Sequence, residues 1–399
     1  TLSGTTSKIL DVNSSGMAIG HATTTNGTTR AVRWSRTMGL MEIAGSDDAA
    51  AWGHGINDAG LVTGAMKTGE NQAKAFVWTL SEGIEELGEV DATSKVRVAG
   101  PSEDGLVAYA GHAWTRETGI MVIEPVEGGT YVHPTAVADG GFVAGDMDTS
   151  SDQLHAFRWN ATAGTQDLGT LGGETSQAVA VNANGLVAGT AQNDAGKKRA
   201  FLWTNDDGMT DLGTLCKGTP TVCGEESEAL AMNARGQVVG WSKTADNKEH
   251  AFLWTSGIGM VDLGTLFEGG SSHATAIDDA GQVAGTAERA DGKVAAFVWL
   301  PETGIVDIGT LGGDSVSVLG MGPQGQIVGF GNTDEDAEHG FVTTAPRSTC
   351  QLCLADDEPP LIACDSNVDL ISASDVCGAS TEDIAPAVTD TCTPAEQIV

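Results

Sequence analysis

Oxygen-bearing side chains occupy alternate positions of one short segment, at Asp146, Asp148, Ser150 and Asp152. Carboxylate and hydroxyl oxygens at alternate positions of a loop are ligands that Ca²⁺ accepts. The segment lacks the central glycine and the distal glutamate of the usual calcium loop, and acidic loops are often only solvated. Ca²⁺ is therefore the one cofactor that the sequence indicates, beside the alternative of a solvated acidic loop.

A second set of residues able to do chemistry is spread along the chain, 36 to 51 residues apart. Its members are polar or aromatic: Trp52, Arg97, His133, Gln177, Glu228 and His273, with His54 beside the first. Such side chains could bind a sugar or a peptide if the fold gathered them around one opening. The alternative is that these positions are exposed and therefore accept any polar residue.

The elements that must position these residues belong to an internal repeat. A tryptophan that ends a run such as Ala-Phe-Leu-Trp recurs at Trp34, Trp78, Trp114, Trp159, Trp203, Trp254 and Trp299. The glycine of a Val-x-Gly run recurs at Gly20, Gly64, Gly145, Gly189, Gly240, Gly285 and Gly329, with Tyr109 in the remaining place. These positions define eight copies, and a period of about 44 residues fits a four-stranded propeller blade.

Each copy contains four short runs with the alternation of β-strands. In the copy that spans 178–213 the runs are 178–182, 186–190, 200–203 and 209–213, and an Asn-Ala-Asn-Gly turn joins the first two. Small residues fill the first run and Phe and Trp the third, as radial blades require because they crowd at the axis and spread outward. The sequence therefore predicts an all-β, eight-bladed β-propeller, with seven blades or a β-solenoid as alternatives.

The repeat also separates architectural residues from candidates for function. The histidines of His-Ala-Phe and the aspartates of Asp-Leu-Gly recur at fixed places, so we interpret them as structural. We expect these histidines to begin third strands and to hydrogen-bond nearby backbone. A functional site should lie where copies differ, at the mouth of the channel that the first strands would line, and the set of polar and aromatic residues occupies that place.

The repeated motifs resemble a known family. His155-Ala156-Phe157 and His250-Ala251-Phe252, each followed by Trp and later by Asp-Leu-Gly-Thr-Leu, are similar to the HAF-repeat family of predicted bacterial extracellular repeat proteins. The resemblance covers residues 1–345 and implies a secreted β-propeller, but no activity or catalytic residue. The first copy departs from the motif with Arg30-Ala31-Val32, and the third lacks the phenylalanine and has a shorter loop.

Composition limits the partners of this chain. Acidic residues outnumber basic ones 54 to 20, which makes nucleic acid and anionic membranes poor partners, and no stretch is long and apolar enough to span a membrane. The cysteines number seven: Cys216, Cys223, Cys350, Cys353, Cys364, Cys377 and Cys392. We expect disulfides in an oxidising compartment, with one cysteine left free or bonded to another chain.

The chain divides into a repeat region, 1–345, and an acidic, cysteine-rich tail, 346–399. The eighth copy lacks a fourth run before the tail begins, so its blade should lack an outer strand. Residues 367–371, Asn-Val-Asp-Leu-Ile, are similar to a fourth run and could fold back onto their own ring or add to that of another molecule.

These features predict a secreted, non-catalytic surface or extracellular-matrix protein of a bacterium. It would act by binding, with a surface glycan as the expected ligand, or by self-assembly into filaments through the tail. Neither the Gly-x-Ser-x-Gly nucleophile motif nor the phosphate-binding loop nor a zinc-ligand spacing occurs in the sequence. The alternative is a polysaccharide lyase or hydrolase with its site at the channel mouth.

Overall fold

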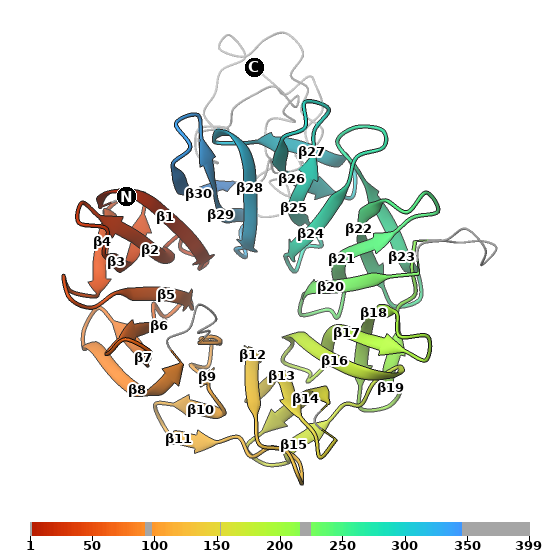
Figure 1. Ribbon diagram of the computed structural model, residues 1–399, viewed down its shortest axis with the longest axis horizontal. Coiled ribbons are helices and arrows are strands. Elements are labelled where there is room, and N and C mark those ends of the chain that lie inside the picture. The colour runs from red at the N-terminus through yellow and green to blue at the C-terminus, as the bar shows by residue number, and fades with distance from the viewer. Residues whose placement is uncertain (1, 92–97, 152, 216–224, 345–399) are drawn as a thin grey trace, which may run out of the picture. The chain divides into compact units, whose positions relative to one another are not determined.

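In the computed structural model, the described residues are 2–91, 98–151, 153–215 and 225–344. They form an all-β ring of eight successive antiparallel sheets, which confirms the predicted eight-bladed propeller and not the seven-bladed alternative (Figure 1). No helix long and apolar enough to cross a membrane occurs in this part of the chain. The predicted outer strand at 367–371 and all seven cysteines lie outside the described residues.

The strands follow the blades in chain order. Blade 1 contains β1 (Ser3–Val12), β2 (Ala18–Thr24), β3 (Thr29–Ser35) and β4 (Gly39–Ala44); blade 2 contains β5 (Ala51–Ile56), β6 (Val62–Lys67), β7 (Gln72–Thr79) and β8 (Gly83–Asp91). Blade 3 has β9 (Val107–Tyr109), β10 (His112–Thr115) and β11 (Gly119–Val122); blade 4 has β12 (Val132–Ala138), β13 (Phe142–Asp148), β14 (Leu154–Asn160) and β15 (Gly164–Asp167).

The second half of the ring repeats this order. Blade 5 contains β16 (Gly172–Val181), β17 (Val187–Asn193), β18 (Lys198–Thr204) and β19 (Gly208–Asp211); blade 6 contains β20 (Ser227–Met232), β21 (Val238–Lys243), β22 (Glu249–Thr255) and β23 (Gly259–Gly264). Blade 7 contains β24 (Ser272–Ile277), β25 (Val283–Glu288), β26 (Val294–Leu300) and β27 (Gly304–Gly309). Blade 8 contains β28 (Gly312–Met321), β29 (Gln326–Thr333) and β30 (Glu338–Thr344), and one parallel pair, Val294 with Ser315, connects it to blade 7.

An asparagine at the end of the first strand shapes the turn and links neighbouring blades. The Asn182 side-chain oxygen accepts hydrogen bonds from the backbone N–H groups of Asn184 and Leu186, and Gly185 takes φ +72°. Its side-chain NH₂ donates to the Ala234 carbonyl of the next blade at 3.2 Å. Asn13, Asn57 and Asn233 make the same donation at 2.9 to 3.0 Å. The predicted turn residue thus also joins the blades.

The repeated glycine of Val-x-Gly permits the close packing of each blade. A Cβ atom on Gly189 would lie 2.0 Å from the Gln177 carbonyl oxygen and 2.8 Å from the Phe201 ring. Phe201 is fully buried, as are its counterparts Phe76, Phe157, Phe252 and Phe297. Because glycine has no Cβ, the second strand can lie under the aromatic ring of the third strand.

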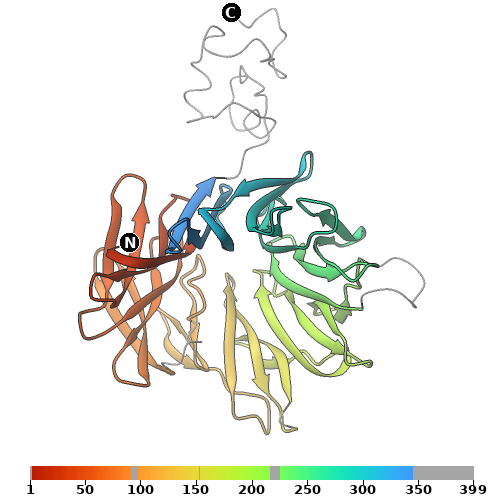
Figure 2. The ribbon, with the colours of Figure 1, turned by 45° about the horizontal axis from the view of Figure 1, so that its top comes forward.

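Blades 1 and 8 close the ring by packing face to face. The Gly340 N–H donates to the Ser7 hydroxyl oxygen at 3.1 Å, and Lys8 forms an ion pair with Glu338 at 3.1 Å. The Lys8 ammonium also lies 3.8 Å from the centre of the Phe330 ring. The tilted view shows the first blade, in red, beside the last, in blue (Figure 2).

Candidate functional site

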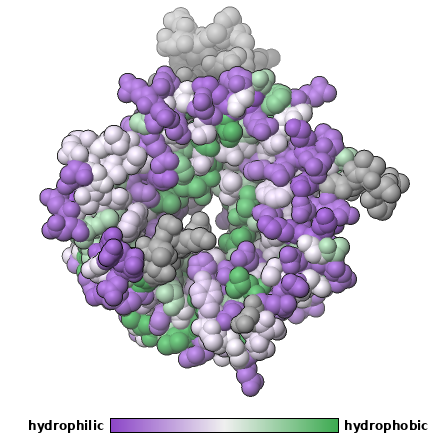
Figure 3. All heavy atoms as spheres, in the orientation of Figure 1, coloured by the Kyte–Doolittle hydropathy of each residue, from purple (hydrophilic) through white to green (hydrophobic). Residues whose placement is uncertain are grey.

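The structure places the predicted channel-mouth residues on the innermost strands. Trp52 and His54 lie on β5, His133 on β12, Gln177 on β16, Glu228 on β20 and His273 on β24, while Arg97 lies outside the described residues. These strands surround the central opening, whose rim in this view carries mainly apolar side chains, with hydrophilic ones further out (Figures 1 and 3).

Most of these side chains form hydrogen bonds or ring contacts with residues of a neighbouring blade or of their own blade. Glu228 accepts a hydrogen bond from Lys198 of the preceding blade at 2.6 Å. His273 Nε2 lies 2.8 Å from Glu249 of the preceding blade, and its ring packs against Trp241 there. Glu228 and His273 therefore each have a partner in the preceding blade, and a binding site at the channel mouth stays a prediction.

His54 and His133 also have partners within the protein. His54 Nδ1 accepts a hydrogen bond from the Val98 N–H of blade 3 at 3.2 Å. His133 Nδ1 lies 3.3 Å from the buried carboxylate of Asp146, and its ring stacks on Tyr131. Partial burial raises the pKa of Tyr131, and the Asp146 charge acts in the same direction.

The predicted calcium ligands are also engaged with protein groups. Asp146 contacts His133, and the Asp148 carboxylate accepts hydrogen bonds from Thr130 Oγ1, Thr130 N–H and Tyr131 N–H at 2.5 to 2.7 Å. These bonds hold the pKa of Asp148 below its ordinary value, the Thr130 hydroxyl contributing most. Ser150 is exposed and Asp152 lies outside the described residues. In the described part of the chain no cluster of three metal-ligating side chains occurs, and the calcium site stays a prediction.

The histidines of the His-Ala-Phe motif differ from expectation in their partner. His155 Nδ1 lies 3.0 Å from both oxygens of Asp167, and His250 Nδ1 lies 2.9 and 3.1 Å from those of Asp262. The partner is therefore the aspartate of Asp-Leu-Gly on the fourth strand, not backbone. The register brings the two together because each histidine begins the third strand where the fourth strand ends.

A cavity of about 850 Å³ lies over blades 2 to 4. It lies where the first strands end, whereas the predicted channel-mouth residues lie near the beginnings of those strands. Its wall is formed by turns between first and second strands (57–61, 103–106 and 140–141) and between third and fourth strands (79–82, 115–118 and 160–162). Within the described residues, which exclude 92–97, blade 3 has three strands, and a single bridge, Ala99 with Ala108, stands where other blades have a first strand. The sequence signal for this cavity is the shortened third copy, which by itself does not indicate a binding site.

The cavity combines apolar and acidic groups. Leu61, Leu106, Trp114, Met121 and Trp159 contribute its apolar lining, and Glu82, Glu103, Asp104 and Glu117 its carboxylates. Among the described residues of the lining, Arg116 is the one basic side chain, and it forms an ion pair with Glu82 across blades 2 and 3. A concave surface of this kind suits a ligand with both cationic and apolar parts.

Backbone donors fix two of these carboxylates. Glu103 accepts a hydrogen bond from the Asp58 N–H at 3.0 Å, and Asp104 accepts one from the Gly140 N–H at 3.0 Å. Partial burial raises the pKa of Glu103, the hydrogen bond from Asp58 N–H opposes this shift, and the charges of Asp58 and Asp139 add to it. A cationic group bound nearby would relieve the crowding of negative charge.

Comparison with known proteins identifies the fold. No protein-family model and no curated protein matches the sequence. Dipeptidyl peptidase 4 of Porphyromonas gingivalis is similar in structure, with a TM-score of 0.56 and 11% identity over 85% of this chain and 58% of that one. A prolyl endopeptidase structure gives 0.51 and 10% over 85% and 54%, and the β-propeller domain of the Trilobed protease from Pyrococcus furiosus gives 0.44 and 12% over 86% and 96%.

These similarities correct the function expected from the sequence. The expectation of a non-catalytic surface or matrix protein is contradicted by the similarity in structure to two peptidases, dipeptidyl peptidase 4 and a prolyl endopeptidase. The chain spans little more than half the length of dipeptidyl peptidase 4 and the prolyl endopeptidase. At these identities the comparison shows the β-propeller fold alone.

Proposed function

We propose that this propeller is the substrate-binding module of a peptide-processing enzyme, and that the cavity over blades 2 to 4 binds a cationic segment of the substrate. The acidic, partly apolar lining of that cavity carries the proposal. Lysine and arginine side chains would complement its carboxylates, while an apolar neighbour in the same peptide would contact Leu61 and Met121. Similarity in fold to peptidases supports the class of enzyme that we propose.

Electrostatics favours a cationic peptide over other ligands. The formal charge of the chain is −34, so it attracts cations from a distance and lowers the affinity for acidic polymers. The cavity concentrates this field because Glu103, Asp104 and Glu117 line a concave, partly apolar surface. Long-range attraction alone would act on every acidic face, so a test must separate the cavity from the rest of the surface.

The test is calorimetric titration with the peptide Gly-Lys-Leu-Lys-Leu-Gly and its counterpart in which glutamate replaces lysine. Glu117→Lys reverses one charge in the cavity wall, and Glu302→Lys is the matched control in the corresponding exposed turn of blade 7. We expect Glu117→Lys to weaken binding of the lysine peptide about fivefold at low salt, and Glu302→Lys to change it less than about twofold.

Equal effects of the two substitutions would reject the cavity as the binding site, because general attraction by the surface would then suffice. Equal affinity for the lysine and glutamate peptides would reject the cationic substrate.

A further inference from the structure

The outer edge of β30 differs from every other third strand of the ring. In blades 1 to 7 the third strand pairs with a fourth strand of the same blade. Within the described residues β30 pairs with β29 only. This edge belongs to blade 8 and faces the junction with blade 1, so it is separate from the cavity over blades 2 to 4 and from the function proposed for that cavity.

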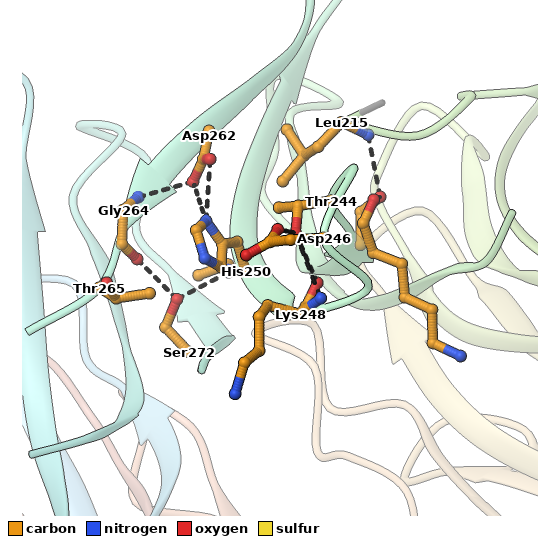
Figure 4. A network of polar contacts seen from close by, with 12 residues as sticks. Leu215, Thr244, Asp246, Lys248, His250, Asp262, Gly264, Thr265 and Ser272 are labelled. Atoms are coloured by element: carbon orange, nitrogen blue, oxygen red, sulfur yellow. Dashed lines mark hydrogen bonds and ion pairs between the residues drawn. The ribbon is translucent and has the colours of Figure 1, made fainter. Parts of the chain in front are cut away.

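The junction of blades 6 and 7 shows what a fourth strand contributes (Figure 4). Asp262 on β23 contacts His250 and accepts a hydrogen bond from the Gly264 N–H at 2.8 Å. Ser272, on the first strand of blade 7, donates to the Gly264 carbonyl at 2.6 Å and accepts from the Ala251 N–H at 2.9 Å. The serine thus ties the third and fourth strands of one blade to the next blade.

The same serine contacts recur at two other junctions. Ser176 accepts from the Ala156 N–H at 2.8 Å and donates to the Gly169 carbonyl at 2.5 Å, between blades 4 and 5. Ser227 accepts from the Ala200 N–H at 3.0 Å and donates to the Gly213 carbonyl at 2.7 Å, between blades 5 and 6. The acceptor is each time the glycine of Asp-Leu-Gly.

The junction of blades 8 and 1 contains the third-strand half of this network. Ser7 accepts from the Gly340 N–H at 3.1 Å, as Ser272 does from Ala251. His339 stands at the place of His250 in the strand register. In the described part of the chain, the Ser7 hydroxyl has no acceptor and His339 no carboxylate partner. Both groups would be satisfied by a strand with a carbonyl and an aspartate at the two corresponding places.

A cavity of about 370 Å³ adjoins this edge, and its apolar lining is Ile9, Val32, Trp34, Leu40, Phe341 and Val342. The counterparts of five of these residues, Phe341 excepted, lie in one cluster with a leucine at the junction of blades 5 and 6. There Leu212, of Asp-Leu-Gly, packs with Leu202, Ala229, Phe252, Trp254 and Met260. The cavity against blade 1 is therefore shaped for the leucine of an added fourth strand.

We propose that the outer edge of β30 binds an extended segment of another polypeptide that carries aspartate followed by leucine or isoleucine. The strand pairs with β30, its aspartate contacts His339, its apolar side chain enters the cavity lined by Val32, Trp34 and Val342, and a carbonyl accepts from Ser7. Backbone pairing supplies affinity that does not depend on sequence, and the three side-chain contacts supply specificity.

The probe is a fluorescent, capped peptide with the sequence of β23, Gly-Met-Val-Asp-Leu-Gly, titrated into the full chain by fluorescence anisotropy. We expect saturable binding that weakens at least tenfold when aspartate replaces the peptide leucine, and at least tenfold in Val342→Phe, which fills the cavity. His339→Leu should remove the preference for aspartate over asparagine in the peptide. His155→Leu is the matched control and should retain that preference, because Asp167 of its own blade is its partner.

The substitutions in the peptide are measured on the unsubstituted protein, so they test the proposal even if a protein variant is misfolded. Absence of saturable binding would overturn the proposal, because another part of the molecule then covers this edge or the edge does not bind strands. Binding that is insensitive to the peptide leucine would overturn it as well.

Discussion

The serine between blades 6 and 7 makes a sharp test of how neighbouring blades are held together. Ser272 is 1% exposed, and its hydroxyl serves one buried donor and one acceptor. Ser272→Ala leaves the Ala251 N–H, on a fully buried residue, without its partner, and it removes the donor to the half-buried Gly264 carbonyl. An unsatisfied buried polar group costs about 1–3 kcal/mol and a lost hydrogen bond about 1 kcal/mol, so the free energy of unfolding should fall by about 2–4 kcal/mol.

Ser7→Ala is the matched control, since Ser7 occupies the same place between blades 8 and 1. Among the described residues its hydroxyl has one hydrogen bond, from the half-buried Gly340 N–H. Its loss should cost about 1 kcal/mol.

Both variants can be compared by urea unfolding, monitored by tryptophan fluorescence, with the free energy obtained by linear extrapolation. Equal losses for Ser272→Ala and Ser7→Ala would refute the reasoning, because the two serines would then have equal numbers of partners in solution. A loss below about 0.5 kcal/mol for Ser272→Ala would show that the junction does not depend on this hydroxyl.

Three further substitutions test the architecture. Burial raises the pKa of Asp11 to about 6 against hydrogen bonds from the backbone of Ile56 and Val12, so its contribution to stability is full below pH 3.8 and is lost as pH rises through about 6. Between pH 3.8 and about 6, the free energy of unfolding of Asp11→Asn should therefore rise relative to that of the unsubstituted protein by at most about 3 kcal/mol. The same pH dependence of this free energy in both proteins would contradict the prediction. Gly189→Ala should lower the free energy of unfolding by about 3 kcal/mol, because the added Cβ contacts the Gln177 carbonyl and the Phe201 ring. Gly196→Ala, at φ +71° in open space, is the control and should lower it by about 1 kcal/mol. Equal melting temperatures of the two variants would contradict this prediction. The side chain of Leu263 is 4% exposed, so Leu263→Ala should lower the free energy of unfolding by about 3 kcal/mol in the same urea assay. A loss under about 1 kcal/mol would show that blades 6 and 7 repack to fill the space left by the leucine.

The repeat made most of the fold predictable. The Asn-x-x-Gly turns, the small first strands and the Phe-x-Trp third strands recur, so the order of strands within a blade follows from one copy and the number of blades from counting the copies. The sequence also shows that the third copy is short, because its run ending at Trp114 lacks the phenylalanine of the motif and its loop is shorter.

Contacts between blades were harder to predict. The serine before the variable position recurs as Ser7, Ser176, Ser227 and Ser272, a signal that a closer comparison of copies would have shown. Its role depends on two strands of the preceding blade, which periodicity alone does not place. The cavity over blades 2 to 4 was missed for a similar reason, because its lining comes from six turns of three blades.

The closure of the ring through face packing has a consequence for how the chain folds. Strand pairs within a blade join residues near in sequence, whereas the Ser7–Gly340 contact joins residues 333 positions apart. Blades can therefore form one after another, each on the surface of its predecessor, as in a linear repeat array. The loop entropy of closure is the cost of the final step alone, so an arc of seven or eight joined blades should precede the closed ring in time.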